Sequence, residues 1–283
     1  VEGFPSGALD FLAVAMQYKE NGKPGGSESK SRRVGFVGNA SYSFEDRYFV
    51  DASFRTDGSS LYGADKRFAP FWSAGIGWNI HRENFMSNVD WINRLKIRAS
   101  VGETGSNNFS AYEAMVTYTY SLSDRYYNWM GANLKALANP DLEWQTTLDK
   151  NIGFDITILN NRLTLTGDYY YKTTDPLLIA ISMPPSSGAT DNMTYKNFGK
   201  QTSKGFTASA TYYIIRRMSE RIWWSVRGNL RHGSNELSGI GNRLEMYNSQ
   251  EREGDNRSTK RYYDGADPDD IWAVRSAGID PST

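Results

Sequence analysis

Hydrophobic and polar residues alternate with a period of two along most of the chain between residues 34 and 231. The stretch RLKIRASVGETG (94–105) begins with a basic residue at every second position and an apolar residue after each of them. Because successive side chains of a β-strand point to opposite faces, this period predicts strands with one apolar and one polar face. Eight segments follow the pattern: 34–44, 47–55, 71–80, 94–105, 151–158, 162–172, 205–214 and 222–231.

The predicted connections between these strands are short and long by turns. Glu45 and Asp46 join the first two strands, and a few residues around Asn160 and Asn161 join the fifth and sixth. The connections at 102–150 and 173–204 are much longer, and the one at 81–93 is intermediate. Short turns at one end and long loops at the other are typical of outer-membrane barrels.

Two all-β architectures fit this pattern, an antiparallel transmembrane β-barrel segment and a soluble β-sandwich. Strand lengths near those of membrane strands, unequal loops and aromatic residues at strand ends favour the barrel, because membrane barrels carry aromatic girdles at both interfaces. These aromatic residues are Phe44, Tyr48, Trp72, Trp78, Tyr169 to Tyr171, Trp223 and Trp224. A soluble β-rich carbohydrate-binding module, with its apolar faces packed together, stays as the alternative.

The alternation of charged and apolar residues also predicts the pairing register of the strand. If Leu95 and Ile97 face lipid, the cations between them point into a water-filled lumen. A slip of one residue would move those cations into hydrocarbon, at about 2–4 kcal/mol each near the midplane. The residues predicted to face the lumen are Arg94, Lys96, Arg98, Asp51 and Arg55. The solvated face of a soluble sheet would show the same alternation.

Composition narrows the classes of function. Aromatic residues make up 14% of the chain, which favours strands, and the 32 basic and 32 acidic residues cancel, so no nucleic-acid partner is expected. The chain has no cysteine, which excludes disulfides and thiolate metal sites. No apolar run is long enough for a helical membrane span. The start, VEGFPSGALD, lacks secretory-signal features, which indicates a cytoplasmic protein or an incomplete gene product.

Seven stretches resemble, in the same order, consecutive barrel segments of SusC-like (RagA-like) TonB-dependent outer-membrane transporters of Bacteroidota. Any one of them is a weak signal, whereas seven in order are specific. They are YSFEDRYFVDASFRTDGSS, FAPFWSAGIGWNIHRENFMS, INRLKIRASVGETGSNN, NPDLEWQTT, NNRLTLTGDYYYKTTDPLL with the following prolines Pro184 and Pro185, NFGKQTSKGF and DDIWAVRSAGIDP.

The resemblance implies a barrel of about 22 strands, of which this chain would supply about eight, with short periplasmic turns and long extracellular loops. It implies location in the cell outer membrane, contact with its lipid, and uptake of oligosaccharides or peptides under a SusD-like surface lipoprotein. Energy would come from the TonB complex through an N-terminal part. No catalysis and no cofactor are implied. Since the family's signal sequence, plug and last strands are missing, residues 1–283 are expected to be a partial barrel domain.

Candidate chemistry outside the strands is sparse. His81 and His232 lie beyond the ends of different strands, and without a nucleophile elbow neither a catalytic triad nor a histidine metal site is expected. GETGSNN (102–108) lacks phosphate-loop spacing and is expected to be a loop leaving a strand. DGADPDD (264–270) holds enough carboxylates for calcium but has ordinary turn composition, so both interpretations stay open.

The longest predicted connection contains SDRYYNWMGANL (123–134). Aromatic rings beside Asp and Asn side chains suit sugar rings or peptide side chains, and packing of the loop against its neighbours would explain them equally well. We predict a ligand-binding loop at Tyr126, Tyr127 and Trp129. The leading hypothesis is thus a piece of a TonB-dependent importer, and an outer-membrane enzyme is disfavoured.

Overall fold

The computed structural model of the chain describes residues 28–63, 65–106, 112–127, 129–183, 185–190, 193–217, 221–245, 248–249 and 261–273. The apolar segment FLAVAMQYKE (11–20), which the sequence left open between helix and strand, lies outside these residues.

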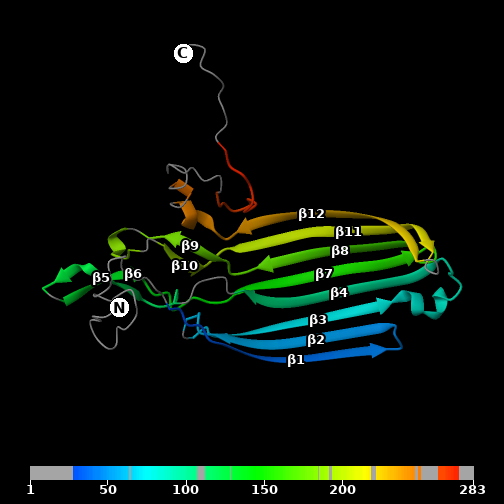
Figure 1. The fold of residues 1–283 in the computed structure, drawn as a ribbon, viewed down its shortest axis with the longest axis horizontal. Coiled ribbons are helices and arrows are strands. Elements are labelled where there is room, and N and C mark those ends of the chain that lie inside the picture. Colours follow the sequence, from blue (N-terminus) through cyan, green and yellow to red (C-terminus); the bar gives the residue numbers. More distant parts are fainter. Residues whose placement is uncertain are drawn as a thin grey trace, which may run out of the picture.

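Eight long strands form one antiparallel sheet in the order β1-β2-β3-β4-β7-β8-β11-β12 (Figure 1). Their bounds are β1 Arg33–Phe44, β2 Tyr48–Ser59, β3 Phe68–Asn79, β4 Ile92–Ser106, β7 Gln145–Ile158, β8 Leu163–Thr174, β11 Lys200–Arg217 and β12 Ile222–Ser238. β1 and β12 are the two edges of this sheet. All eight predicted strands are confirmed, and the all-β antiparallel fold with them.

Several strands extend further than the alternation indicated. β7 begins at Gln145 and β11 at Lys200, because QTTLDK and KQTSK continue the backbone pairing with residues that, apart from Leu148, are polar on both faces. β4 runs on through Ser106, so the first five residues of GETGSNN belong to a strand and not to a loop. Alternation marks the part of a strand that meets two different environments, and not the strand's full length.

The connections lie at two ends of the sheet, as predicted. At the end with short turns, left-handed residues close the β1–β2 and β7–β8 hairpins, among them Glu45, Asp46, Asn160 and Asn161. The β3–β4 connection at this end holds two short 3₁₀ helices, η2 Ile80–Arg82 and η3 Asn84–Met86.

The other end carries the long connections, and they are more ordered than the sequence indicated. Two extra hairpins lie there, on the left of Figure 1, with η4 Pro185–Ser187 and η6 Gly241–Leu244 in the same region. The hairpins pair β5 Thr117–Tyr126 with β6 Trp129–Ala136, and β9 Leu178–Ser182 with β10 Met193–Asn197. None of the helices in the described ranges is long and apolar enough to cross a membrane.

Buried apolar side chains gather at the long-loop end. One cluster consists of Leu177, Phe198, Leu237, Ile240 and Leu244, and a second of Leu61, Tyr62, Phe71 and Trp144. In the second cluster the rings of Tyr62 and Trp144 stack with centroids 4.2 Å apart. Burial raises the pKa of the Tyr62 hydroxyl, which donates a hydrogen bond to the Ser106 carbonyl over 3.0 Å.

The middle of the eight-stranded sheet is a single layer. Ile97 and Phe154, at its centre, are 39% and 44% exposed, and the neighbouring Leu95 and Ile156 are only half-buried. A β-sandwich would enclose these four side chains between two sheets. No second sheet covers them within the described residues, so the soluble sandwich has no support.

Candidate functional site

The register of the strands assigns each residue of the sheet to one of two faces. Residues paired across strands share a face. One row contains Tyr42, Val50, Ile76, Ala99, Ile152, Tyr169, Phe206 and His232, and its face is called the apolar face. The adjoining row on the opposite side contains Ser41, Asp51, Gly75, Ser100, Asn151, Tyr170, Gly205 and Gly233, and its face is called the polar face.

All five residues predicted to face the lumen lie on the polar face. Asp51, Lys96 and Arg98 border one shallow groove of about 220 Å³. Two of the residues that line this groove, Gly75 and Gly77 of β3, have no side chain to fill it.

The other two predicted residues lie apart from that groove. Arg55, near the long-loop end of β2, pairs with Asp57 on the same strand, Nε to Oδ1 over 2.6 Å. Arg94 is exposed near the start of β4, at the opposite end.

A cluster of three charged side chains on the polar face centres on Arg98 and crosses three strands. Its Nη2 lies 2.9 Å from Asp168 Oδ1 on β8, and its Nε lies 3.4 Å from Asp155 Oδ2 on β7. The three side chains are 37%, 21% and 24% exposed, so water screens this cluster less than it would a fully exposed pair. Two carboxylates thus hold one guanidinium flat against the polar face.

Gly153 makes this arrangement possible. It lies between Arg98 and Asp168 in one cross-strand row. A Cβ atom at Gly153 would come within 2.5 Å of Asp168 Oδ1 and 3.1 Å of Arg98 Cζ. The absence of a side chain on β7 therefore lets Arg98 reach across that strand to β8.

The sequence prediction missed Asp155 and Asp168. Both are acidic residues at polar positions of predicted strands, in NIGFDITI and RLTLTGDYYYK, and that was the available signal. Their partner is far along the chain, since Arg98 and Asp168 are 70 residues apart. One further pair on this face was missed, Lys172 Nζ with Asp149 Oδ2 over 2.7 Å.

The apolar face carries a band of exposed hydrophobic side chains that runs diagonally across the sheet. Phe44 on β1 and Leu230 on β12 share a row, but on β12 the band continues three rows further toward the short turns, to Trp224. Three rows are about 20 Å along a strand, and the seven spacings from β1 to β12 are about 34 Å. A band parallel to a membrane plane then requires strands tilted by roughly 30°, close to the tilt of membrane barrels.

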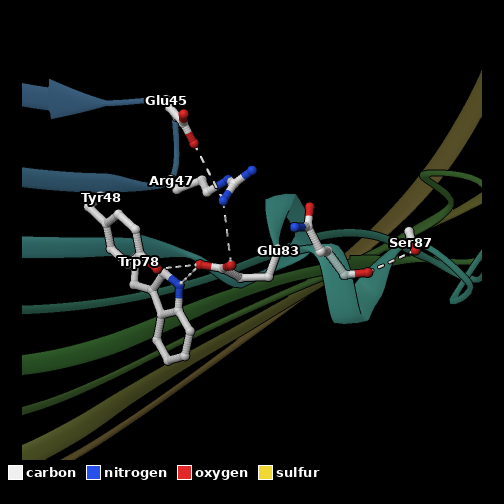
Figure 2. A network of polar contacts seen from close by, with 7 residues as sticks. Glu45, Arg47, Tyr48, Trp78, Glu83 and Ser87 are labelled. Carbon is white, nitrogen blue, oxygen red and sulfur yellow. Dashed lines mark hydrogen bonds and ion pairs between the residues drawn. The ribbon is translucent and has the colours of Figure 1, made fainter.

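An aromatic pair marks the short-turn edge of this band (Figure 2). The rings of Tyr48 and Trp78 stack with centroids 6.4 Å apart. The Tyr48 hydroxyl and the Trp78 indole N–H both donate to Glu83 Oε1, over 2.6 and 2.9 Å. Rings on the apolar face with polar tips turned to a carboxylate beyond the strand end match the interfacial belt of membrane proteins.

Glu83 is held ionised by these contacts. The hydrogen bond from Tyr48, and next that from Trp78, lowers the pKa of the Glu83 carboxyl. Arg47 adds a longer ion pair, Nη1 to Glu83 Oε2 over 3.9 Å, and pairs with Glu45 Oε2 over 3.4 Å (Figure 2).

The aromatic residues predicted to bind ligand lie at the tip of the β5–β6 hairpin. Tyr127 forms the turn and is 86% exposed. Tyr126 and Trp129 face each other as paired residues of β5 and β6, but their side chains lie outside the described part of the structure. An apolar pocket of about 310 Å³ lies elsewhere at this end, between β9, β12 and Tyr262.

The aspartates of DGADPDD bind backbone amides. Asp264 accepts hydrogen bonds from the N–H groups of Ile240 and Gly241, and Asp267 accepts from that of Asp269. The Asp269 amide lowers the pKa of the Asp267 carboxyl. The Asp267 contact is a local turn contact, whereas Asp264 joins this segment to the chain after β12. In the described ranges no three His, Cys, Asp or Glu side chains cluster as a metal site would require.

The model of the TonB dependent receptor-like β-barrel family matches residues 10–273. The chain belongs to that family. It is 33% identical over 197 residues to TonB-dependent receptor P39 of Formosa agariphila, an alignment that covers 69% of this chain and 18% of P39. It is 30% identical over 218 residues to the TonB-dependent receptor SusC of Bacteroides thetaiotaomicron, covering 74% of this chain and 21% of SusC.

Solved structures give the same result. The RagAB peptide transporter matches with a TM-score of 0.71 and 27% identity over 86% of this chain and 26% of the matched chain. The RagAB peptide importer in its closed-closed state also matches with a TM-score of 0.71. This chain thus spans about a quarter or less of the length of its relatives, as a SusC-like segment of an outer-membrane TonB-dependent barrel that the segment does not close by itself.

Proposed function

We propose that this chain forms part of the wall of a TonB-dependent importer that takes up glycans or peptides together with a SusD-like surface lipoprotein. One observation carries the proposal: a receptor-family sheet, one layer thick, is apolar on one face and polar on the other. Similarity to the TonB-dependent receptor SusC supports the importer, and similarity to the RagAB peptide importer supports peptides as one cargo class. The proposal involves no covalent chemistry and no cofactor, and the energy comes through TonB contacts outside this segment.

Uptake by cells that carry the full-length gene tests the proposal. We expect deletion of the gene, or of TonB, to abolish uptake of one labelled class, oligosaccharides or peptides. Uptake of monosaccharides and amino acids, which are small enough for porins, should stay unchanged. If uptake of both labelled classes survives the deletion, the importer assignment is wrong.

The proposed lumen lies on the polar face, along Asp51, Arg55, Arg94, Lys96 and Arg98. Because this chain has no cysteine, adjacent residues of β4 can be compared by thiol labelling in a full-length protein otherwise free of cysteine. Ser100→Cys lies on the polar face and Ala99→Cys on the apolar face. A charged maleimide should modify the first quickly and the second slowly. Equal rates would contradict a water-filled lumen on that face.

Tyr126, Tyr127 and Trp129 are proposed to contact cargo at the hairpin tip. Replacing all three by Ala should raise the half-saturation concentration for uptake by roughly tenfold or more, since each aromatic contact contributes about 0.5–1.5 kcal/mol. Phe85→Ala, an exposed aromatic residue at the short-turn end, is the matched control and should have no effect. If the half-saturation concentration is unchanged at normal surface expression, the three aromatic residues do not contact cargo and only pack the loop against its neighbours.

A further inference from the structure

Two lysines interrupt the apolar face. Lys150 on β7 and Lys204 on β11 both pair with Tyr171 on β8, so the three residues form one row with Tyr171 in the middle. Both lysines are exposed, and neither has an ion-pair partner among the residues that the structure describes. Lys172, on the opposite face of the same region, pairs closely with Asp149. The two outward amines therefore have no counter-charge among the described residues.

The lysine row lies at the long-loop edge of the apolar band. Moving toward the long loops, the first polar outward residue is Glu103 on β4, Lys150 on β7, Lys204 on β11 and His232 on β12. This border descends across the sheet with the same slope as the lower edge of the band. Long loops lie outside the cell in such barrels, so the row lies at the level of the outer-leaflet headgroups.

An apolar groove of about 400 Å³ begins directly below the row. The next row toward the short turns is Ile152, Tyr169 and Phe206, and the row after it is Phe154, Gly167 and Ala208. These side chains, with Ile97, form its walls. Gly167 and Ala208 are small residues between larger neighbours in this lining, and the Phe154 ring lies over Gly167, in the space where a side chain would be.

We infer that this surface binds one phosphorylated lipid of the outer leaflet, with its phosphate between Lys150 and Lys204 and an acyl chain in the groove beneath. The two lysine Cα atoms are separated by two strand spacings, about 10 Å. Flexible ammonium groups at that separation can both reach one phosphate or two phosphates on one headgroup. Tyr171 between them offers a phenolic donor for the same headgroup. The position on the lipid side, away from the polar face, excludes cargo as the occupant.

Charge complementarity decides for an anionic lipid. Glu103 and Glu236 lie one row nearer the long loops, on the flanking strands β4 and β12, and neither pairs with the two lysines in the described structure. The positive charge is therefore confined to the stretch above the groove. A headgroup whose phosphates carry net negative charge neutralises it, whereas the phosphate of a zwitterionic headgroup is already balanced by that headgroup's own amine, and an uncharged sugar headgroup supplies no counter-ion.

Native mass spectrometry of the full-length transporter in detergent tests this site, with lipid A and dephosphorylated lipid A as probes. Lys150→Gln with Lys204→Gln should lower lipid A affinity by roughly 25-fold, about fivefold for each lysine near an anionic headgroup. Lys172→Gln, which removes the same charge from the opposite face, should change it less than twofold. Ala208→Phe, which fills the groove on the lipid side, should also weaken binding. Each variant's uptake activity reports separately on the proposed importer.

Four results would overturn the inference. Equal affinity of the transporter for lipid A and dephosphorylated lipid A would remove phosphate recognition. Competition by millimolar inorganic phosphate as complete as that by lipid A would indicate a site for free phosphate. Equal losses in the Lys172 variant and the double variant would show a general charge effect. Binding that depends on Ala208 but not on the lysines would likewise reject the site as drawn, leaving only a groove for acyl chains.

Discussion

An arginine placed on the apolar face at the middle of the membrane should destabilise the barrel strongly. Ala99 suits this test, because it lies halfway between Leu95 and Glu103 on the apolar face of β4 and in one row with Ile76 and Ile152. Ala99→Arg should cost about 2–4 kcal/mol, the penalty for arginine at the midplane of a membrane barrel. That corresponds to a loss of roughly 30- to 900-fold in the ratio of folded to unfolded protein.

The penalty should fall with distance from the midplane. Val101 and Glu103 lie on the same face of β4, two and four residues nearer the long loops. With 3.4 Å per residue and a tilt of roughly 30°, they are about 6 and 12 Å above Ala99, against a half-height of about 12.5 Å for the apolar band. We therefore expect Val101→Arg to cost about 1–2 kcal/mol and Glu103→Arg close to nothing.

The assay is urea unfolding of the full-length transporter in phospholipid vesicles, followed by tryptophan fluorescence. Thr166→Arg is the control, since Thr166 lies on the polar face opposite Asp155, where a new cation meets water and a carboxylate. It should change the free energy of unfolding by less than about 0.5 kcal/mol. The two-face assignment is refuted if Ala99→Arg costs no more than Thr166→Arg, or if the cost does not decline from Ala99 to Glu103.

Three further predictions concern local contacts. Gly153→Val should displace the Asp168 carboxylate from Arg98 and lower the free energy of unfolding by about 1–2 kcal/mol. Gly228→Ala is the control and should be tolerated, because a Cβ atom there would meet no atom within 4 Å. Equal urea midpoints for the two variants would contradict this prediction. Because the folded-state pKa of Glu83 is lowered, its stabilising contribution is present above the unfolded-state pKa and is lost as pH falls through the folded-state value. Glu83→Gln should therefore reduce the loss of stability at acidic pH, measured as the free energy of unfolding against pH. An unchanged loss in the variant would mean that other groups cause it. Asp264→Ala should speed amide hydrogen exchange at 240 and 241, the two amides its carboxylate accepts from, and unaltered exchange would mean that water replaces it without loss.

Local alternation was enough to predict the eight long strands of the main sheet and which of their residues share a face. Arg98 could be placed on the polar face from RLKIRASVGETG alone, because the period of two is a property of consecutive residues. Its partner Asp168 could not be identified from the sequence, because β4 pairs with β7 across the long connection that holds the β5–β6 hairpin. The register across such a connection is set by the backbone hydrogen bonds between the strands and not by local residues. The role of Gly153, which leaves space for Arg98 to reach Asp168, can be recognised only once that register is known.

The long connections were predicted least well. TYTYS at the start of β5 alternates as the long strands do, but it is short and was assigned to a loop. The buried cluster around Leu177, Leu237 and Ile240 joins three separate segments. No periodic signal marks such a cluster, since two of the segments supply one side chain each, Leu177 and Phe198, and the third supplies Leu237, Ile240 and Leu244. At this end tertiary packing, rather than a difference between lipid and water, decides which side chains are covered.

The tilt of the strands accounts for lysines on a lipid-facing surface without a large energetic cost. Lys150 and Lys204 share a row with Ala52 on β2, where the band continues above that row to Phe54. If rows were parallel to the membrane, both ammonium groups would lie below Phe54, in hydrocarbon. A tilt of roughly 30° raises each successive strand by about 2.4 Å, so Lys150 stands about 7 Å and Lys204 about 12 Å nearer the outer surface than Ala52. The same geometry moves Trp224 of β12 up to the level of Phe44 on β1, so one inclination sets both edges of the band and leaves the lysines among the headgroups.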